Sequence, residues 1–166
     1  MNDVPHAMKV EVAKALSADR QALTNLLQLY LHDFSEIDGS DLGSDGTYGY
    51  PYLDAYWTDH GRHPFLIRAD GKLAGFALVR ILPTEEGDEV HMAEFFVVRK
   101  YRRKRVGEAA ARQIFDAFPG RWVVTELAPN VVGQDFWRSV ISRYRGVAPV
   151  ERRTEKSVTQ EFIVPR

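Results

Sequence analysis

The sequence predicts one α/β domain of the α+β type, built on a single mixed sheet. Its 166 residues are about the length of one domain, and 45% hydrophobic with 27% charged residues is an ordinary composition for a globular protein. Segments with the two-residue period of strands alternate with segments of helical period, and no repeat or linker separates them. We therefore expect residues 1–166 to form a single domain.

The first third of the chain predicts a strand, two helices and a long loop. Residues 9–12 alternate as a strand does, and Ser17 is a candidate N-cap for a helix over residues 18–34. Leucine and aromatic side chains recur at helical spacing in that helix, which indicates core packing. Residues 38–51 are rich in Gly, Ser and Asp and predict a loop, while residues 52–59 predict a short helix.

The rest of the chain predicts strands and helices in alternation. An Asp-Gly pair at residues 70–71 is expected to join strands over residues 65–68 and 73–82 in a hairpin. The later elements are a strand over 90–98, a helix over 106–118, a strand over 122–127, a helix over 132–144, a candidate strand near 147–152 and a strand over 157–164. The last strand alternates in polarity, so we expect it to be half-exposed and a candidate for pairing across a homodimer.

Charge is distributed unevenly along the chain, although the net charge is only −1. Residues 31–60 contain seven Asp or Glu and neither Lys nor Arg, whereas residues 99–105 contain six Lys or Arg. This basic run follows a predicted strand and opens a helix at Val106, where free amides favour an anion. Gly107 leaves room for a ligand at the backbone. The pattern predicts a phosphate-binding turn, with a solvated charge run or a nucleic-acid patch as alternatives.

Several classes of function are disfavoured by the composition. The chain has no cysteine, which excludes disulfides, thiolate zinc sites and a cysteine nucleophile and suits a reducing cytoplasm. No segment approaches the ~20 apolar residues of a membrane span, and residues 1–12 carry no signal pattern, so we expect a cytoplasmic protein without a membrane partner. His60 and His63 have metal-like spacing without a carboxylate motif, so we expect no metal.

The basic turn and its flanks resemble the coenzyme A signature of the GNAT N-acetyltransferase superfamily, which reads Gln/Arg-x-x-Gly-x-Gly/Ala between a strand and a helix. Arg102 matches its first position and Gly107 its last, while Arg105 stands at the middle glycine. Residues 70–78 are similar to the family's central hairpin, and residues 130–138 to its last helix motif. The order of the predicted elements is also that of the family, and the chain is similar to its bacterial-type members.

This resemblance implies both a fold and an activity. The fold would be a mainly antiparallel GNAT-like sheet, splayed between its fourth and fifth strands to admit the pantetheine arm of acetyl-CoA. The activity would be acetyl-CoA-dependent N-acetyl transfer, made directly to a primary amine of a small cationic molecule or protein. The alternative is a GNAT-fold sensor that binds acyl-CoA without efficient turnover.

The resemblance also assigns cofactor-binding positions. The implied set is Phe96, Val97, Val98, Arg102, Arg103, Lys104, Arg105, Val106, Gly107, Glu108, Asn130 and Trp137. The strand backbone would bind pantetheine, an amide near Val97 or Val98 would polarise the thioester carbonyl, and amides over 103–108 would hold the pyrophosphate. Asn130 and the last helix would border the far side of the cofactor.

Two catalytic residues follow from the same comparison. An alkyl ammonium of pKa ~10.4 costs about 4.6 kcal/mol to deprotonate at pH 7, so a general base is useful. Glu94 is the predicted base, with an ion pair to a nearby arginine as the alternative and Glu126 as a second base acting through water. The family's usual acidic tyrosine is Trp137 here, so Tyr144 is the candidate acid unless CoA leaves as a thiolate.

The acidic and aromatic region falls where the family places its acceptor wall. Its aromatic residues are Tyr48, Tyr50, Tyr52, Tyr56 and Trp57. With the neighbouring Asp residues they are predicted to select a cationic amine, and a solvated loop with anchoring aromatics is the alternative. The same acidic segment disfavours broad contact with a polyanion, so we expect no nucleic-acid partner.

Overall fold

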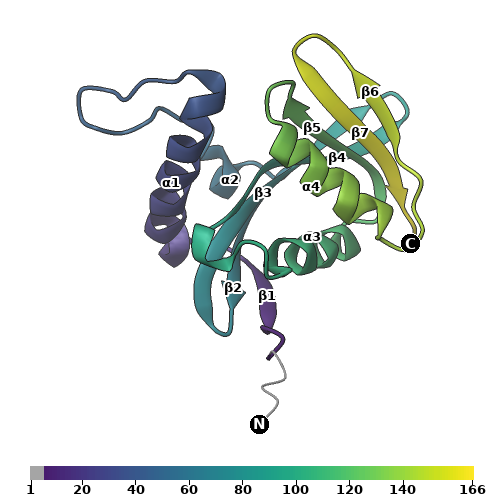
Figure 1. Cartoon of the computed structure of the whole chain (residues 1–166), viewed down its shortest axis with the longest axis horizontal. Coiled ribbons are helices and arrows are strands. Elements are labelled where there is room, and N and C mark those ends of the chain that lie inside the picture. The colour runs from purple at the N-terminus through teal and green to yellow at the C-terminus, as the bar shows by residue number, and fades with distance from the viewer. Residues whose placement is uncertain (1–5) are drawn as a thin grey trace.

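The computed structural model describes residues 6–166, and its central feature is one seven-stranded sheet (Figure 1). The strands are β1 (Val10–Lys14), β2 (Arg62–Ala69), β3 (Lys72–Thr84), β4 (Gly87–Val97), β5 (Gly120–Leu127), β6 (Val150–Arg153) and β7 (Ser157–Val164). They lie in the order β1-β2-β3-β4-β5-β7-β6. The pair β4–β5 is parallel and the other neighbouring pairs are antiparallel, as the resemblance implied.

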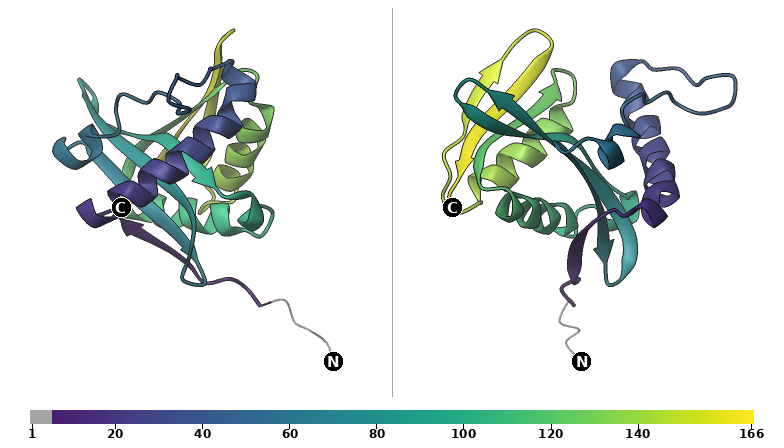
Figure 2. Two further views of the ribbon diagram at one scale, coloured as in Figure 1. Left: turned by 90° about the vertical axis from the view of Figure 1, so that its left-hand side faces the viewer. Right: turned by 180° about the vertical axis from the view of Figure 1, so that it is seen from behind.

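Helices cover both faces of the sheet. Helices α1 (Arg20–Asp38) and α2 (Ala55–Thr58) lie on one face, and α3 (Val106–Ala117) and α4 (Val131–Ser142) lie on the other (Figures 1 and 2). The loop between α1 and α2 extends from the end of α1 (Figure 2). Within residues 6–166, no helix combines the length and the apolar character needed to cross a membrane.

Most predicted elements are confirmed, with one correction at the start of α1. The Asp70-Gly71 turn has the positive φ angles of a tight hairpin, at 48° and 76°, and β6 confirms the candidate strand near residue 150. Ser17 does not cap α1, because residues 17–19 form a separate 3₁₀ turn and α1 begins at Arg20. The Asp19 carboxylate instead accepts a hydrogen bond from the Leu16 amide at 2.9 Å.

The last strand is not the dimer edge that the sequence predicted. Strand β7 lies between β5 and β6 and is hydrogen-bonded on both sides. Its alternation has the predicted burial, since Val158, Gln160, Phe162 and Val164 face the interior. The edges of the sheet are β1 and β6, and β6 pairs with Val158–Glu161 of β7, so β7 is not an edge strand.

A β-bulge in β4 changes the face on which its later side chains lie. Leu78 pairs with Glu94 and Val79 with Met92, so Ala93 is an extra residue without a partner on β3. Met92 packs in the core cluster beneath α3 and α4, whereas Leu78 packs beneath α1. The bulge therefore places Glu94 on the α1 face, opposite to the face of Met92.

Strands β4 and β5 separate soon after they meet. Their parallel pairing covers only Glu89–His91 of β4 and Arg121–Val123 of β5. Beyond these positions the facing edges of β4 and β5 have no strand between them, which confirms the predicted splay. The turn before α3 and the first turn of α4 lie at the open end of this gap (Figure 1).

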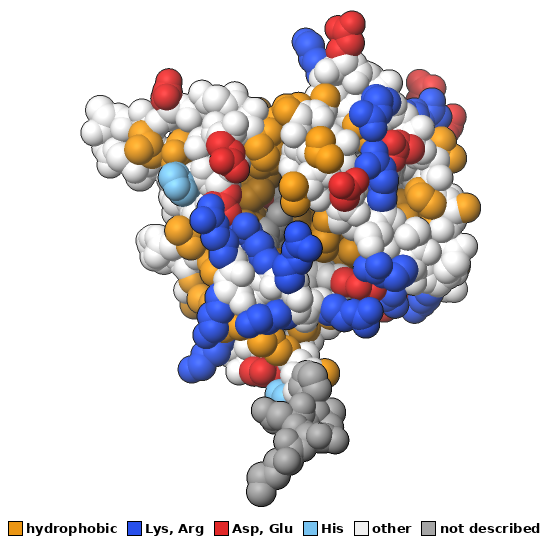
Figure 3. All heavy atoms as spheres, in the orientation of Figure 1, with side chains coloured by type: hydrophobic (Ala, Val, Ile, Leu, Met, Phe, Trp, Pro, Cys, Tyr) orange, Lys and Arg blue, Asp and Glu red, His pale blue; other side chains and the backbone are white. Residues whose placement is uncertain are grey.

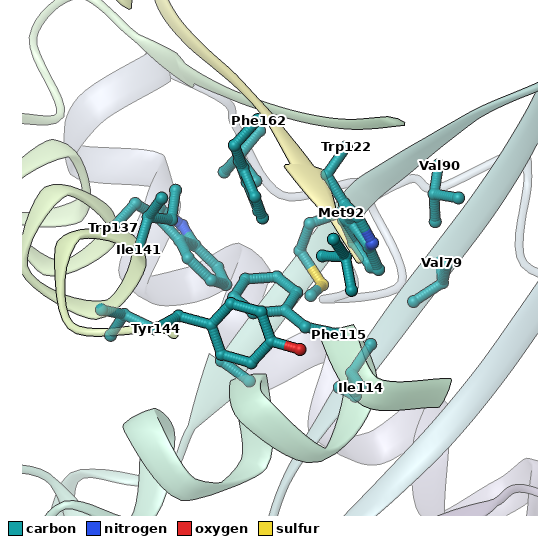
Figure 4. Close-up of a cluster of buried hydrophobic side chains, with 14 of the residues drawn as sticks. Val79, Val90, Met92, Ile114, Phe115, Trp122, Trp137, Ile141, Tyr144 and Phe162 are labelled. Atoms are coloured by element: carbon teal, nitrogen blue, oxygen red, sulfur yellow. The ribbon is translucent and has the colours of Figure 1, made fainter. Parts of the chain in front are cut away.

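The core beneath α3 and α4 is largely aromatic (Figure 4). Phe115 of α3 packs edge-to-face on Trp122 and Phe162, with ring centroids 4.9 and 5.1 Å apart. Trp137 of α4 lies 5.0 Å from Phe95 of β4, so α4 is fixed against the strand that borders the gap. This packing holds the two sides of the splay in a defined position.

Candidate active site

Glu94 lies at the splay and accepts hydrogen bonds from two tyrosines. The Tyr30 hydroxyl of α1 donates to its Oε2, and the Tyr50 hydroxyl, from the loop before α2, donates to its Oε1 at 3.3 Å. Tyr30 also packs its ring on Phe76 and Phe96. The helical spacing had assigned Tyr30 to the core. The one sequence signal of a polar role was its hydroxyl group, which is unusual in an otherwise apolar stripe. Tyr50 was predicted for the acceptor wall.

The surroundings of Glu94 bring the pKa of its carboxyl group close to neutral pH. Burial raises the pKa of Glu94 from an ordinary 4.5 to about 7, hydrogen bonds from Tyr30 and Tyr50 oppose the rise, and the charge of Glu126 adds to it. Burial also raises the pKa of Tyr30 and of Tyr50 above the usual range, so both stay protonated donors. No arginine forms an ion pair with Glu94 within the described chain, which removes that alternative.

Glu126 is a second buried carboxylate, on the β5 side of the splay. It accepts hydrogen bonds from Asn130 Nδ2 at 2.6 Å and from Trp137 Nε1 at 3.0 Å. Burial raises its pKa, and these two hydrogen bonds oppose the rise. Asn130 also caps α4 by accepting from the Gly133 amide at 3.1 Å. Asn130 and Trp137, both predicted to bind cofactor, therefore hold Glu126 in place.

The backbone of β4 presents alternate amides to the gap. The Val98 amide donates to the Ala74 carbonyl at 2.7 Å, and the Val98 carbonyl accepts from Tyr101. Val98 therefore lacks the free backbone groups predicted for it. Because antiparallel ladders alternate, Phe96 likewise directs its backbone to β3, and the Val97 amide faces the gap. The Val97 carbonyl accepts a hydrogen bond from Arg102 Nε at 2.7 Å.

The turn between β4 and α3 holds two arginines in left-handed backbone conformation. Arg103 and Arg105 have φ angles of 61° and 60°. Such angles cost a non-glycine residue about 1–2 kcal/mol, so Arg105 takes the glycine-like conformation of the family motif despite its side chain. Arg103, Lys104 and Arg105 are exposed and form no ion pair with the described residues.

Positive side chains gather at this turn, below a hollow lined by hydrophobic side chains between α1 and α4 (Figure 3). Arg99 and Arg102 are not free, because Asp33 of α1 binds both at 2.7 and 2.6 Å. Burial raises the pKa of Asp33, but the hydrogen bonds from Arg102 and Arg99 outweigh it and leave the pKa lowered. Asp33 thus fixes the turn to α1.

The first residues of α3 are packed against the protein through their side chains. Val106 is fully buried, and Glu108 binds Arg112 and Arg143 at 3.0 and 2.9 Å. A Cβ on Gly107 would lie 3.1 Å from the Phe136 ring of α4. Gly107 therefore serves close packing of α3 on α4, and of residues 106–108 only the backbone amides remain as candidate ligands.

Tyr144, the candidate acid, lies away from Glu94 in the aromatic core (Figure 4). Its hydroxyl donates to Asp116 Oδ1 at 2.6 Å, near the C-terminal end of α3. Burial raises the pKa of Tyr144 to about 12, with the Asp116 hydrogen bond adding to the rise. Asp116 is nine residues after Gly107, about 13 Å along the helix, so the structure does not bring Tyr144 to the splay.

The aromatic region is already occupied by arginines of the same chain. The Arg62 guanidinium lies 5.7 Å from the Tyr52 ring and 5.2 Å from the Tyr56 ring, and Arg20 lies 4.9 Å from Trp57. Three of the five aromatic rings predicted to contact a cationic acceptor are therefore in contact with internal cations, whereas Tyr48 and Tyr50 are not among them. Among residues 6–166, no group of three His, Asp or Glu side chains is placed to hold a metal ion.

Comparison with known protein families identifies a family to which the chain is similar. A family model described as the acetyltransferase (GNAT) family matches residues 23–140. The chain belongs to this family. No curated protein sequence matches it significantly. The family assignment covers both the Glu94 strand and the turn that leads into α3.

Solved structures of acetyltransferases share the fold at low sequence identity. An acetyltransferase from Thermus thermophilus is 16% identical with a TM-score of 0.67, over 94% of this chain and 97% of that one. The ribosomal-protein-S18-alanine N-acetyltransferase of Escherichia coli is 12% identical with a TM-score of 0.59, over 95% and 96%. A nourseothricin acetyltransferase is 14% identical with a TM-score of 0.55, over 94% and 99%. At such identities the likeness shows the fold alone.

Proposed function

We propose that this GNAT protein is an N-acetyltransferase that uses acetyl-CoA and transfers the acetyl group directly to a primary amine. The observation that carries the proposal is Glu94, a buried carboxylate at the splay whose pKa is raised to about 7. In this proposal residues 1–166 form one domain, and the protein is cytoplasmic. The lack of cysteine favours the cytoplasmic location.

The residues around the gap fit acetyl-CoA as the donor. The edge of β4 past His91 is unpaired, and the Val97 amide faces the gap. The first amides of α3 favour an anion, and Arg103, Lys104 and Arg105 add exposed positive charge beside them. When bound there, acetyl-CoA would supply the acetyl thioester, and the Val97 amide is the available donor for its carbonyl oxygen.

Glu94 acts on the acceptor. Its raised pKa leaves a substantial fraction of the carboxylate ionised at neutral pH yet makes it basic enough to take a proton from an ammonium group. Tyr30 and Tyr50 orient both carboxylate oxygens. The Trp137 indole donates its hydrogen bond to Glu126, and the Tyr144 hydroxyl donates to Asp116, away from the splay. Neither residue therefore supplies the acid, and CoA leaves as a thiolate.

The acceptor of this proposal is a small molecule or a protein with a primary amine. Two structural neighbours are a ribosomal-protein-S18-alanine N-acetyltransferase and a nourseothricin acetyltransferase, so acceptors of different kinds occur on this fold. The predicted preference for a cationic acceptor loses part of its support, because Arg62 and Arg20 contact three of the five aromatic rings that were to select it.

Thermal unfolding with and without acetyl-CoA tests the donor site. A ligand at about 100 times its dissociation constant adds ~2.7 kcal/mol, so the parent is expected to melt several degrees higher. The double variant Arg103→Glu, Lys104→Glu is expected to lose this shift, and Lys72→Glu, an exposed lysine at the start of β3, to keep it. No shift in the parent at millimolar acetyl-CoA would refute the proposal. Binding without transfer to any amine would favour the acyl-CoA sensor instead.

A further inference from the structure

A row of basic side chains crosses three strands on the face of the sheet that holds Glu94. Arg62 of β2 lies directly opposite Arg80 of β3, and Arg80 lies opposite His91 of β4. The neighbouring row on the same face pairs Leu78 with Glu94. Two residues along a strand span about 7 Å, so the basic row lies within reach of a small molecule held at Glu94.

The charges in this row are only partly compensated. Arg62 binds Asp59 through one contact of 3.3 Å, although its side chain is only 14% exposed. His91 contacts Glu89 at 3.1 Å. Arg80 is exposed and forms no ion pair or side-chain hydrogen bond anywhere in residues 6–166. Like charges directly opposite each other destabilise a sheet, so the Arg62–Arg80 pair costs stability unless an anion lies between them.

An unpartnered hydroxyl lies above the same row. Tyr56 of α2 is 3% exposed, and its hydroxyl makes no hydrogen bond of good geometry in the described chain. The Arg62 guanidinium nevertheless lies close enough to oppose the rise in the Tyr56 pKa that burial causes. A buried polar group without a well-formed hydrogen bond is costly, and a ligand oxygen would satisfy this one. The Arg62 guanidinium lies 5.2 Å from the Tyr56 ring, so the hydroxyl and the basic row share one neighbourhood.

Tyrosine side chains connect the basic row with Glu94, the proposed base. Arg62 lies 5.7 Å from the Tyr52 ring, and the Tyr52 and Tyr50 rings are 5.9 Å apart. Tyr50 in turn donates to Glu94 at 3.3 Å. A chain of direct contacts therefore leads from the Arg62 guanidinium to the carboxylate that would deprotonate an amine.

We infer that the acceptor is an amino-acid-type molecule whose carboxylate binds Arg80 and Arg62, with the Tyr56 hydroxyl, while its amine lies at Glu94. One uncompensated arginine matches a group of charge −1, and guanidinium groups bind the planar carboxylate with paired hydrogen bonds. This inference rests on the proposed function, because it names the substrate class of the same site. It replaces the net positive acceptor that the acidic region had suggested with a zwitterion.

The test uses matched acceptors and follows release of free CoA thiol from acetyl-CoA. The pairs are phenylalanine with phenethylamine, tyrosine with tyramine and alanine with ethylamine, which differ only in the carboxylate. The parent is expected to favour at least one amino acid by tenfold or more in kcat/KM. Arg80→Ala is expected to lower that preference about tenfold to hundredfold, mainly through KM. Arg80→Lys should retain part of it, and Lys72→Ala all of it.

Each other outcome overturns the inference in an identifiable way. Equal kcat/KM within every pair, or an unchanged preference in Arg80→Ala, would remove the carboxylate site and leave the transferase proposal intact. A preference for phosphoethanolamine over ethanolamine alone would assign the row to phosphate. A parent that acetyl-CoA stabilises but that acetylates no amino acid also contradicts it. A parent that acetyl-CoA fails to stabilise removes the proposed function itself, and the inference with it.

Discussion

The Tyr30 hydroxyl donates a hydrogen bond to the Glu94 carboxylate and so joins α1 to the strand beside the splay. The two residues are 64 positions apart, and the bulge at Ala93 makes the contact feasible by placing Glu94 on the α1 face. Burial raises the pKa of Glu94 to about 7, while this hydrogen bond acts against the rise. The contact therefore helps set the pH at which Glu94 becomes a base.

Replacement of Glu94 by glutamine is expected to stabilise the protein at alkaline pH. The folded pKa of Glu94 is raised above that of the unfolded chain, so the parent loses stability as pH rises from about 4.5 to about 7. Glu94→Gln lacks this loss, and its advantage should grow across that window to at most about 3 kcal/mol above pH 7. Urea unfolding at pH 5 and pH 8 measures the difference, with Glu155→Gln, an exposed glutamate, as control. An advantage independent of pH would contradict a raised pKa.

Loss of a tyrosine hydroxyl at Glu94 is expected to move the acidic limb of the pH–rate profile upward. The hydrogen bonds from Tyr30 and Tyr50 lower the pKa of Glu94, so Tyr30→Phe or Tyr50→Phe should raise it by about 0.5 to 1 unit. Steady-state kcat/KM between pH 5 and pH 9 gives the limb. Tyr48→Phe removes a hydroxyl that contacts Ser35 and His32 instead, and should leave the limb in place. A downward shift in Tyr30→Phe would show that the hydroxyl does not stabilise the carboxylate.

Replacement of Arg105 by glycine is expected to stabilise the ligand-free protein. Arg105 has a φ angle of 60°, which glycine adopts freely, and relief of this strain exceeds the entropy cost of glycine by about 0.5–1 kcal/mol. Lys104→Gly is the matched control, because Lys104 is not among the residues of positive φ and glycine there should cost about as much. Denaturant midpoints compare the two. If Arg105→Gly unfolds at a lower concentration than the parent, the turn is not strained as described.

Alanine at position 75 is expected to disrupt the pairing of β3 with β4, the strand that carries Glu94. A Cβ on Gly75 would overlap the Phe96 carbonyl of β4, and backbone cannot move aside as a side chain can. Overpacking of this kind costs about 3 kcal/mol or more. Gly49→Ala, which meets nothing within 4 Å, should change stability little. Equal midpoints for the two variants in urea would contradict the close approach of β3 to β4.

Much of the fold follows from periodicity, but the placement of the Glu94 side chain, the proposed base, does not. The Asp70-Gly71 hairpin, the basic turn and α3 carry local signals that the structure confirms. The sequence around Ala93 carries no glycine or proline to mark a bulge, and register depends on the partner strand. The face of Glu94 was therefore not predictable from its own strand.

The candidate site was predicted in part, through the resemblance and not through physics alone. Glu94 was assigned as the base, but its partner Tyr30 looked like one more core residue of an amphipathic helix. Val98 was assigned a free amide, yet residue identity does not tell which amides of a strand face its neighbour. The arginine at position 105 does not predict a left-handed backbone conformation, because arginine has no preference for it.

Acetyl transfer by the parent and by Glu94→Gln, measured as free thiol and as acetylated amine by mass spectrometry, tests whether Glu94 is the general base. We expect the parent to acetylate at least one primary amine, with a rate that rises with pH through about 7. Glu94→Gln should bind acetyl-CoA as the parent does but transfer about 10²- to 10⁴-fold more slowly. Equal rates in the two proteins, or a parent rate independent of pH from 5 to 9, would contradict Glu94 as the base.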